Sequence, residues 1–137
     1  MSLYLCVFVL GVEVDGVDAG SYSDFNRLRH YVAQELENGI PGARFPSLNL
    51  HSDCEGEWSA EDCIGLSDEL VRIIEAMRKR PAVNFPLGWQ VALAKTLRLA
   101  PRNALESFID ADGEPVLLRI LGLVEIALSA GEPILFQ

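Results

Sequence analysis

The chain has 137 residues, half of them hydrophobic, which is enough for one domain with a sizeable core. Its 20 acids and 11 bases give a net charge of −9, and residues 1–63 carry most of the excess, with eleven acids and three arginines. Nucleic acid and anionic membranes are therefore disfavoured as partners, because phosphate binding requires the opposite charge, and a basic protein suits better. The alternative is that the acidity serves only solubility.

Cysteine content and targeting signals indicate a compartment. The three cysteines, Cys6, Cys54 and Cys63, do not make a disulfide framework in a chain of this length. Leu3–Leu10 is short for the apolar region of a signal peptide and follows no basic residue. No apolar run approaches the roughly 18 residues needed to span a bilayer. We expect a cytoplasmic protein with reduced thiols.

The first third of the chain predicts a strand, a loop and a helix. Leu3–Val9 is a continuous apolar run, typical of a central strand covered on both faces. Gly11–Gly20 contains three glycines and three acids, so we expect a loop. Ser21 or Ser23 can cap a helix that runs to about Asn38. Its apolar positions recur at helical spacing: Phe25, Leu28, Val32 and Leu36.

The middle of the chain predicts a second strand and a second helix. Phe45–His51 alternates apolar and polar residues, which favours a strand. Ser59 with Asp62 forms a variant capping box, and the helix that follows closes on the basic run 78–80 before Pro81. One stripe of this helix is apolar: Cys63, Leu66, Leu70, Ile73, Ile74 and Met77.

The last third predicts two more helices and a final strand. Pro86 and Gly88 interrupt residues 81–102, and a helix is expected over Trp89–Leu99. Pro115 suits the start of the last helix and Gly131 its end. Val116–Leu128 between them is apolar nearly all round, so deep burial is expected. Residues 134–136 then form a short apolar strand.

The order of these elements predicts an α/β fold, with α+β as the alternative. We expect a single domain over residues 1–137, with a small mixed sheet of three or four strands packed with about four helices. Strands separated by helices permit parallel pairing through right-handed crossovers. The sequence contains neither GxGxxG nor a P-loop, so no nucleotide cofactor is expected.

The turn from His51 to Glu57, with Cys63 nearby, gathers imidazole, thiol and carboxylate groups. As a zinc site it offers irregular ligand spacing and no CxxC pair. As a Cys–His nucleophile pair it lacks an identifiable orienting residue. A polar turn with an incidental histidine is the favoured interpretation, and we expect no stoichiometric metal.

Residues 110–114 resemble the start of a calcium loop. The calcium-binding pattern needs a further oxygen ligand before its glycine and a glutamate six residues after it. In this sequence Gly113 comes early and position 119 is Arg119. A turn before a helix, with acids near the helix N-terminus, is the simpler interpretation.

The sequence leaves undecided the roles of four acidic residues and of two tryptophans. Glu13, Asp15, Asp18 and Asp24 could be catalytic carboxylates, but their glycine-rich surroundings favour a solvated loop. The two tryptophans, Trp58 and Trp89, could anchor a protein interface, and core packing is at least as well supported for either.

Several segments together resemble the immunity protein 70 family. These small bacterial proteins are assigned to polymorphic toxin systems, in which an immunity protein neutralises a cognate toxin made by the same cell. The resemblance covers nearly the whole chain and identifies no catalytic or binding residues. It rests on Gly16–Phe25, Phe45–Leu48, His51–Asp53, Gly56–Trp58, Arg102–Pro115 and Pro133–Gln137.

The resemblance implies a protein that binds a toxin and needs no catalytic group. We expect no cofactor, and the sequence leaves both a monomer and a homodimer open. Toxins that cut nucleic acid are often basic, so a basic nuclease is one candidate partner. The alternatives are a small enzyme or metal-dependent hydrolase centred on the turn from His51 to Cys54, or an adaptor or oligomerisation domain. We expect the toxin-binding residues on two loops at one end of the sheet: Asp15, Asp18, Asp53, Glu55, Glu57 and Trp58.

Overall fold

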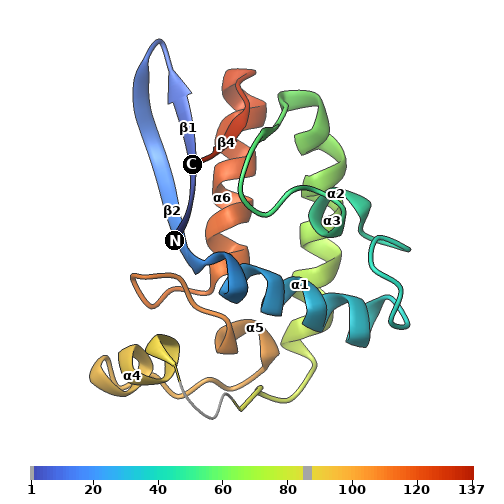
Figure 1. The fold of residues 1–137 in the computed structure, drawn as a ribbon, viewed down its shortest axis with the longest axis vertical. Helices are drawn as coiled ribbons and strands as arrows, with labels where there is room; N and C mark the ends of the chain where they lie inside the picture. Colours follow the sequence, from blue (N-terminus) through green and yellow to red (C-terminus); the bar gives the residue numbers. More distant parts are fainter. Residues whose placement is uncertain (1, 85–87) are drawn as a thin grey trace.

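The computed structural model describes residues 2–84 and 88–137. This part of the chain forms one four-stranded sheet and six helices, and the long helices lie against one face of the sheet (Figure 1). The prediction of an α/β fold with three or four strands is confirmed, with six helices in place of about four. The strands are β1 Ser2–Val9, β2 Val12–Ser21, β3 Glu57–Trp58 and β4 Ile134–Phe136.

The sheet has the strand order β2-β1-β4-β3. Every pairing in the described residues is antiparallel: β1 pairs with β2 and β4, and β4 pairs with β3. The sheet is therefore purely antiparallel rather than mixed. The tight β1–β2 hairpin makes the first pair antiparallel. β4, which follows the last helix, then pairs with the other side of β1 and also runs in the opposite direction.

Residues 11–20 were expected to form a loop, but all of them except Gly11 belong to the strand β2. Leu10 and Gly11 form a two-residue turn with φ angles of 52° and 78°. Positive φ at both positions is the type I′ geometry whose twist suits a β-hairpin. The loop prediction was wrong because three glycines and three acids obscure an alternation that buries Val17 and Ala19 on one face.

The two long helices begin at predicted serine caps: α1 Tyr22–Leu36 and α3 Ala60–Arg78. The Ser21 hydroxyl accepts the N–H of Asp24, and the Asp24 carboxylate accepts the N–H of Ser21. Ser59 and Asp62 repeat this arrangement at α3. Such reciprocal bonds satisfy two donors that a helix start leaves unpaired. The apolar positions predicted for both helices are all buried.

The strand predicted over residues 45–51 is instead a single helical turn, α2 (Pro46–Asn49). Glu69 of α3 accepts the N–H groups of Ser47 and Leu48 at 3.0 and 3.1 Å. A carboxylate at the start of a helical turn satisfies donors that the turn itself cannot pair. The strand prediction was wrong because this stabilising residue lies far along the chain, outside any local pattern.

The helix predicted over Trp89–Leu99 is present as α4 (Trp89–Thr96), which ends three residues earlier, and a short helix α5 (Ala104–Ser107) follows. No residue of α4 is buried. The Trp89 indole Nε1 donates a hydrogen bond to Oδ2 of Asp24 at 2.7 Å, which connects α4 to the start of α1. Pro86, expected to interrupt this region, lies outside the described residues.

The last helix, α6 (Val116–Ala130), ends at Gly131, whose φ of 69° is left-handed. The prediction of burial on all sides was wrong. α6 packs on α3 and the sheet, and its remaining side faces solvent: Leu118 and Leu128 are 36% and 39% exposed, and Leu121 is only partly buried. Neither α6 nor any other helix in the described ranges has the length and apolar character needed to cross a membrane.

The sheet has one covered face and one open face. Leu3, Leu5 and Val7 of β1 are fully buried in the core formed with the long helices. Tyr4 and Phe8 alternate with them along the strand and are only partly buried. The expectation that β1 is covered on both faces was therefore wrong, because α1, α3 and α6 all pack on the same side (Figure 1).

Candidate binding surface

A long acidic stretch runs from residue 45 to residue 71, with seven acids and no lysine or arginine. Glu69 is buried, and Asp68 pairs with Arg72 at 3.3 Å. The other five take part in no ion pair among the described residues, and we call them the acidic segment: Asp53, Glu55, Glu57, Glu61 and Asp62. They span the turn before β3, β3 itself and the first turn of α3.

Contacts with α1 and β4 hold the turn before β3 in place. Asn26 Nδ2 donates to Oδ2 of Asp53 at 2.6 Å, and Arg29 Nη1 donates to the carbonyl oxygen of His51 at 2.6 Å. The bond from Asn26 is the main cause that lowers the pKa of Asp53 below its usual range. The His51 ring stacks on Phe136 with 4.3 Å between centroids. The turn therefore presents its carboxylates from a fixed position.

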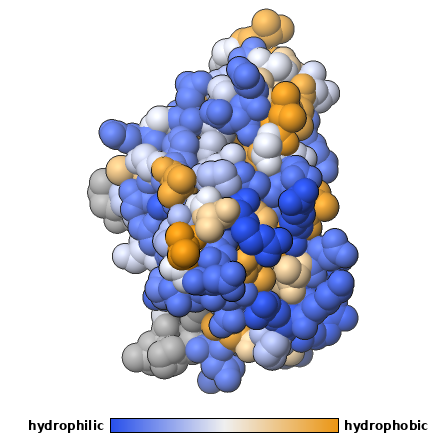
Figure 2. Space-filling view, turned by 90° about the vertical axis from the view of Figure 1, so that its right-hand side faces the viewer, coloured by the Kyte–Doolittle hydropathy of each residue, from blue (hydrophilic) through white to orange (hydrophobic). Residues whose placement is uncertain are grey.

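The outer side of α3 continues this polar surface. Ile64 and Val71 are 65% and 51% exposed on the helix. Figure 2 views this side and shows apolar side chains as small, separate patches on a largely hydrophilic surface. Isolated apolar residues of this kind are ordinary on protein surfaces. This side of the molecule is therefore largely polar, without a large apolar patch.

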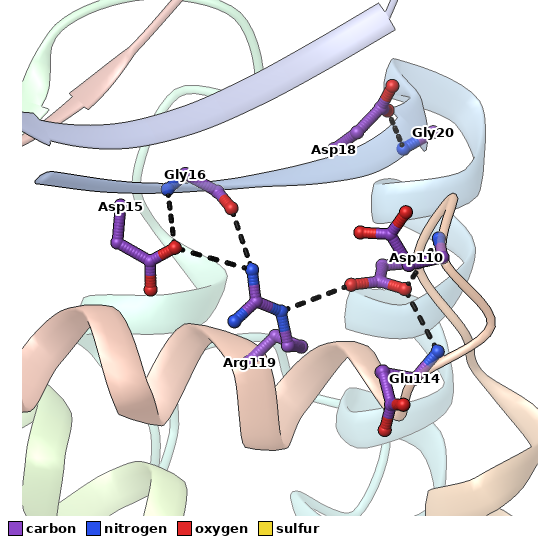
Figure 3. A network of polar contacts seen from close by, with 8 residues as sticks. Asp15, Gly16, Asp18, Gly20, Asp110, Glu114 and Arg119 are labelled. Carbon is purple, nitrogen blue, oxygen red and sulfur yellow. Dashed lines mark hydrogen bonds and ion pairs between the residues drawn. The ribbon is translucent and has the colours of Figure 1, made fainter. Parts of the chain in front are cut away.

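Asp15 and Asp18 lie on opposite faces of β2 (Figure 3). Asp15 points toward the helices, where its Oδ1 lies 3.5 Å from Nη2 of Arg119. Asp18 points the other way, and its Oδ1 accepts the N–H of Gly20 at 2.9 Å. β2 and β3 are the two edge strands of the sheet. The expectation that both aspartates lie on a loop beside the acidic segment is therefore wrong: they lie on the strand at the opposite edge of the sheet, and only Asp18 is on its open face.

Trp58 lies beneath the surface rather than on it. It is almost fully buried, its Nε1 donates to the carbonyl oxygen of Ser47 at 2.9 Å, and its ring contacts Phe136 edge-on at 4.7 Å between centroids. A buried, hydrogen-bonded indole is not available as an interface anchor. Trp58 instead fixes β3 against the core, so its predicted contact role is corrected to a supporting one.

The turn from His51 to Cys54 does not bring a catalytic pair together. Both ring nitrogens of His51 lie 2.8 Å from carbonyl oxygens, of Ser52 and Glu57. Cys54 is exposed, whereas burial raises the pKa of the Cys63 thiol to about 11. Within residues 2–84 and 88–137 no three His, Cys, Asp or Glu side chains are grouped so as to hold a metal ion.

The side chain of Asp110, the first residue of the 110–114 turn, holds the turn together by hydrogen bonds. Asp110 is 0% exposed, and its Oδ1 accepts the N–H groups of Asp112 and Glu114, both at 2.9 Å (Figure 3). Its Oδ2 lies 3.4 Å from Nε of Arg119. A guanidinium therefore stands beside the carboxylate that a calcium ion would need. This geometry agrees with the interpretation of a turn that precedes a helix.

Arg119 is the organising residue that sequence reasoning missed. From α6 it reaches both Asp110 and Asp15, and its Nη2 donates to the carbonyl oxygen of Gly16 at 2.8 Å. It thus connects β2 with the 110–114 turn (Figure 3). One feature of the sequence could have pointed to it: Arg119 is the only lysine or arginine after residue 102.

Comparison with known proteins identifies the family. A family model described as Immunity protein 70 matches residues 3–136, which include the acidic segment and the 110–114 turn. No curated protein and no solved structure gives a significant match. The chain therefore belongs to the immunity protein 70 family.

Proposed function

We propose that this protein neutralises a toxin by binding it through a non-catalytic acidic surface centred on Asp53, Glu55 and Glu57. Membership of the family implies an immunity protein that acts against a toxin. The surface itself is inferred from one observation. Residues 45–71 contain seven acids and neither lysine nor arginine, and the acidic segment has no ion-pair partner among the described residues.

Such an inhibitor needs a rigid scaffold and a complementary surface rather than a reactive group. Enzymes that cut nucleic acid are often basic around the active site, since they bind phosphates. An uncompensated acidic surface attracts a basic protein over distance and raises the association rate, while covering the active site blocks substrate. A basic nuclease is therefore the toxin class that we favour.

The remaining predicted contact residues divide by position. Asp15 faces Arg119, and Trp58 is buried, so both support the scaffold rather than the contact. Asp18 lies on the open face of the sheet. We further propose a cytoplasmic location, because Cys6, Cys54 and Cys63 are all free thiols.

The test is protection of cells that express the toxin encoded by the neighbouring gene. We expect the wild-type chain to protect, and the double variant Glu55→Lys, Glu57→Lys to protect poorly, because association with a basic toxin slows. Both side chains are exposed and neither accepts a hydrogen bond from a described side chain, so the melting temperature should change little.

The matched control is Asp112→Lys, Glu125→Lys, which carries the same charge change at exposed positions outside the acidic segment. Equal protection by the two double variants would exclude the acidic segment as the contact surface. Failure of the wild-type chain to bind or protect against this toxin would remove the immunity role for that pair.

A further inference from the structure

The open face of the sheet carries a continuous row of residues across all four strands. Glu57 pairs with Leu135, Leu135 with Cys6, and Cys6 with Gly16. Residues paired directly across neighbouring strands project from the same face. The row therefore runs from one edge of the sheet to the other, on the side away from α1, α3 and α6.

Two aromatic residues lie on either side of this row. Tyr4 and Phe8 flank Cys6 on β1, and Cys6 is buried although it is not part of the core cluster that the helices cover. The Tyr4 ring lies over Gly16, since a methyl group added there would be 1.9 Å from the Tyr4 hydroxyl oxygen. That hydroxyl donates to Oε2 of Glu13 at 3.0 Å. The aromatic surface is thus held in place by β2.

The charged side chains that the four strands place on this face are all negative. Phe8 pairs with Glu13, and Tyr4 with Asp18, which places both acids beside the aromatic rings, and Glu57 stands at the far edge. The four strands contain no lysine or arginine. Glu13, Asp18 and Glu57 form no ion pair with any residue in the described ranges.

We propose that this open face, defined as Tyr4, Phe8, Leu135, Glu13, Asp18 and Glu57, is a contact surface for the toxin and extends the acidic segment. The inference rests on the proposed function. The partner surface it fits has an apolar side chain at its centre, seated on Tyr4 and Phe8, with lysines or arginines around it. Aromatic residues dominate the binding energy of protein interfaces, and surrounding charges set specificity and association rate.

Charge distinguishes this partner from the other occupants of an open sheet face. A second copy of the chain would bring two sets of three carboxylates together, and like charges across an interface are costly. Nucleic acid and anionic lipid are repelled for the same reason. A basic protein meets no such penalty.

The size of the face explains why the acidic segment is also needed. Strand spacing and rise give an area of roughly 350 Å² for the open face, because β3 and β4 are short. A standard interface buries about 800 Å² on each partner. Glu57 belongs to both the open face and the acidic segment, so the two surfaces are continuous through β3. A toxin that covers both surfaces would bury an area typical of a stable complex.

The experiment measures binding to a catalytically inactive form of the toxin encoded by the neighbouring gene, with two matched pairs of variants. Phe8→Ala is compared with Leu128→Ala, and Glu13→Lys with Glu125→Lys, where both controls lie on the helical side. We expect Phe8→Ala to raise Kd about thirtyfold or more. Glu13→Lys should slow association about tenfold. The control variants should stay within about twofold of wild type.

Glu13→Lys changes an exposed side chain, so it tests the proposal even if Phe8→Ala proves unstable. If the wild-type chain binds the toxin and both open-face variants bind it with the wild-type affinity and association rate, this inference is overturned and the proposed function stands. A wild-type chain that sediments as a dimer, and becomes monomeric in Phe8→Ala, would also overturn it, since the face would then join two copies. Absence of wild-type binding would remove the proposed function and this inference with it.

Discussion

Arg119 is the one cation that pairs with the buried carboxylate of Asp110 in the described part of the chain. Its Nε lies 3.4 Å from Oδ2 of the aspartate, which is 0% exposed, whereas the arginine side chain is 32% exposed. No hydrogen bond satisfies this Oδ2. The arginine therefore compensates a charge that water cannot reach, and it does so from the helix that follows the aspartate's own turn.

Arg119→Met is expected to destabilise the fold by about 2–3 kcal/mol. Removing one partner of a fully buried ion pair costs about 3–5 kcal/mol, and the partial exposure of Arg119 reduces this figure. The substitution keeps most of the side chain's apolar packing while removing its charge and its bond to Gly16. Denaturant unfolding of the variant and the parent measures the difference.

The control is a double-mutant cycle with Asp110→Asn. If the cost arises from the uncompensated carboxylate, Arg119→Met should be markedly less harmful in the Asp110→Asn background. Asp15→Asn should cost under about 1 kcal/mol, since that pair is partly exposed and 3.5 Å apart. Strict additivity of Arg119→Met and Asp110→Asn would show that the two residues are not coupled.

Elements whose determinants are local could be predicted from the sequence. Ser21 with Asp24, and Ser59 with Asp62, mark the start of α1 and α3, because the cap and its partner are three residues apart. Gly131 marks the end of α6 through its left-handed φ. In each case the stabilising group and the group it stabilises lie within one helical turn.

Elements and site residues that depend on distant groups could not be predicted in this way. α2 depends on Glu69, and which of Asp15 and Asp18 faces the helices depends on the register of β2 against β1. The open face follows from the pairings of β1 with β2, the next strand along the chain, and with β4, the last one. Acidic character was readable from composition, whereas the division of the acids between two sheet edges was not.

Burial around α6 leads to a second prediction. Leu123 is fully buried, whereas Leu121, two residues earlier, is only partly buried at the margin of the core. Leu123→Ala should cost about 2–5 kcal/mol, because it loses transfer free energy and leaves a cavity. Leu121→Ala should cost about 1 kcal/mol, since solvent can fill the space. Equal midpoints in urea unfolding would contradict the orientation of α6.

Glu37 gives a prediction for acid stability. Burial alone raises the pKa of Glu37, but hydrogen bonds from the N–H groups of Arg44 and Phe45, and from the Asn49 amide, outweigh burial and lower the pKa below the ordinary value of 4.5. A carboxyl group with a lowered pKa stabilises the fold above its unfolded pKa, and this contribution is lost as pH falls through the folded pKa.

Glu37→Gln should therefore lower the free energy of unfolding at pH 7 by about 1.5–3 kcal/mol, the range for hydrogen bonds to charged groups. The difference from wild type should shrink as the pH falls below about 4.5, because the unfolded wild-type chain then takes up a proton that the folded carboxylate binds only at a lower pH. Glu55→Gln, at an exposed position, is the control and should change little at any pH. Unfolding measured from pH 7 to pH 3 would contradict this role if the Glu37→Gln difference stayed constant.

The last prediction concerns α4, which has no buried residue and is connected to α1 through the hydrogen bond from Trp89 to Asp24. Helices with little buried area open locally before the rest of a domain unfolds. Trp89→Phe keeps an aromatic ring and removes the donor, so amide hydrogen exchange in α4 should accelerate about fivefold to tenfold, corresponding to roughly 1 kcal/mol. The global free energy of unfolding should change by under about 0.5 kcal/mol, because the core is untouched. Trp58→Phe, which loses its bond to Ser47 inside the core, should instead lower global stability. Unchanged exchange in α4 of the Trp89→Phe variant would mean that other contacts hold this helix in place.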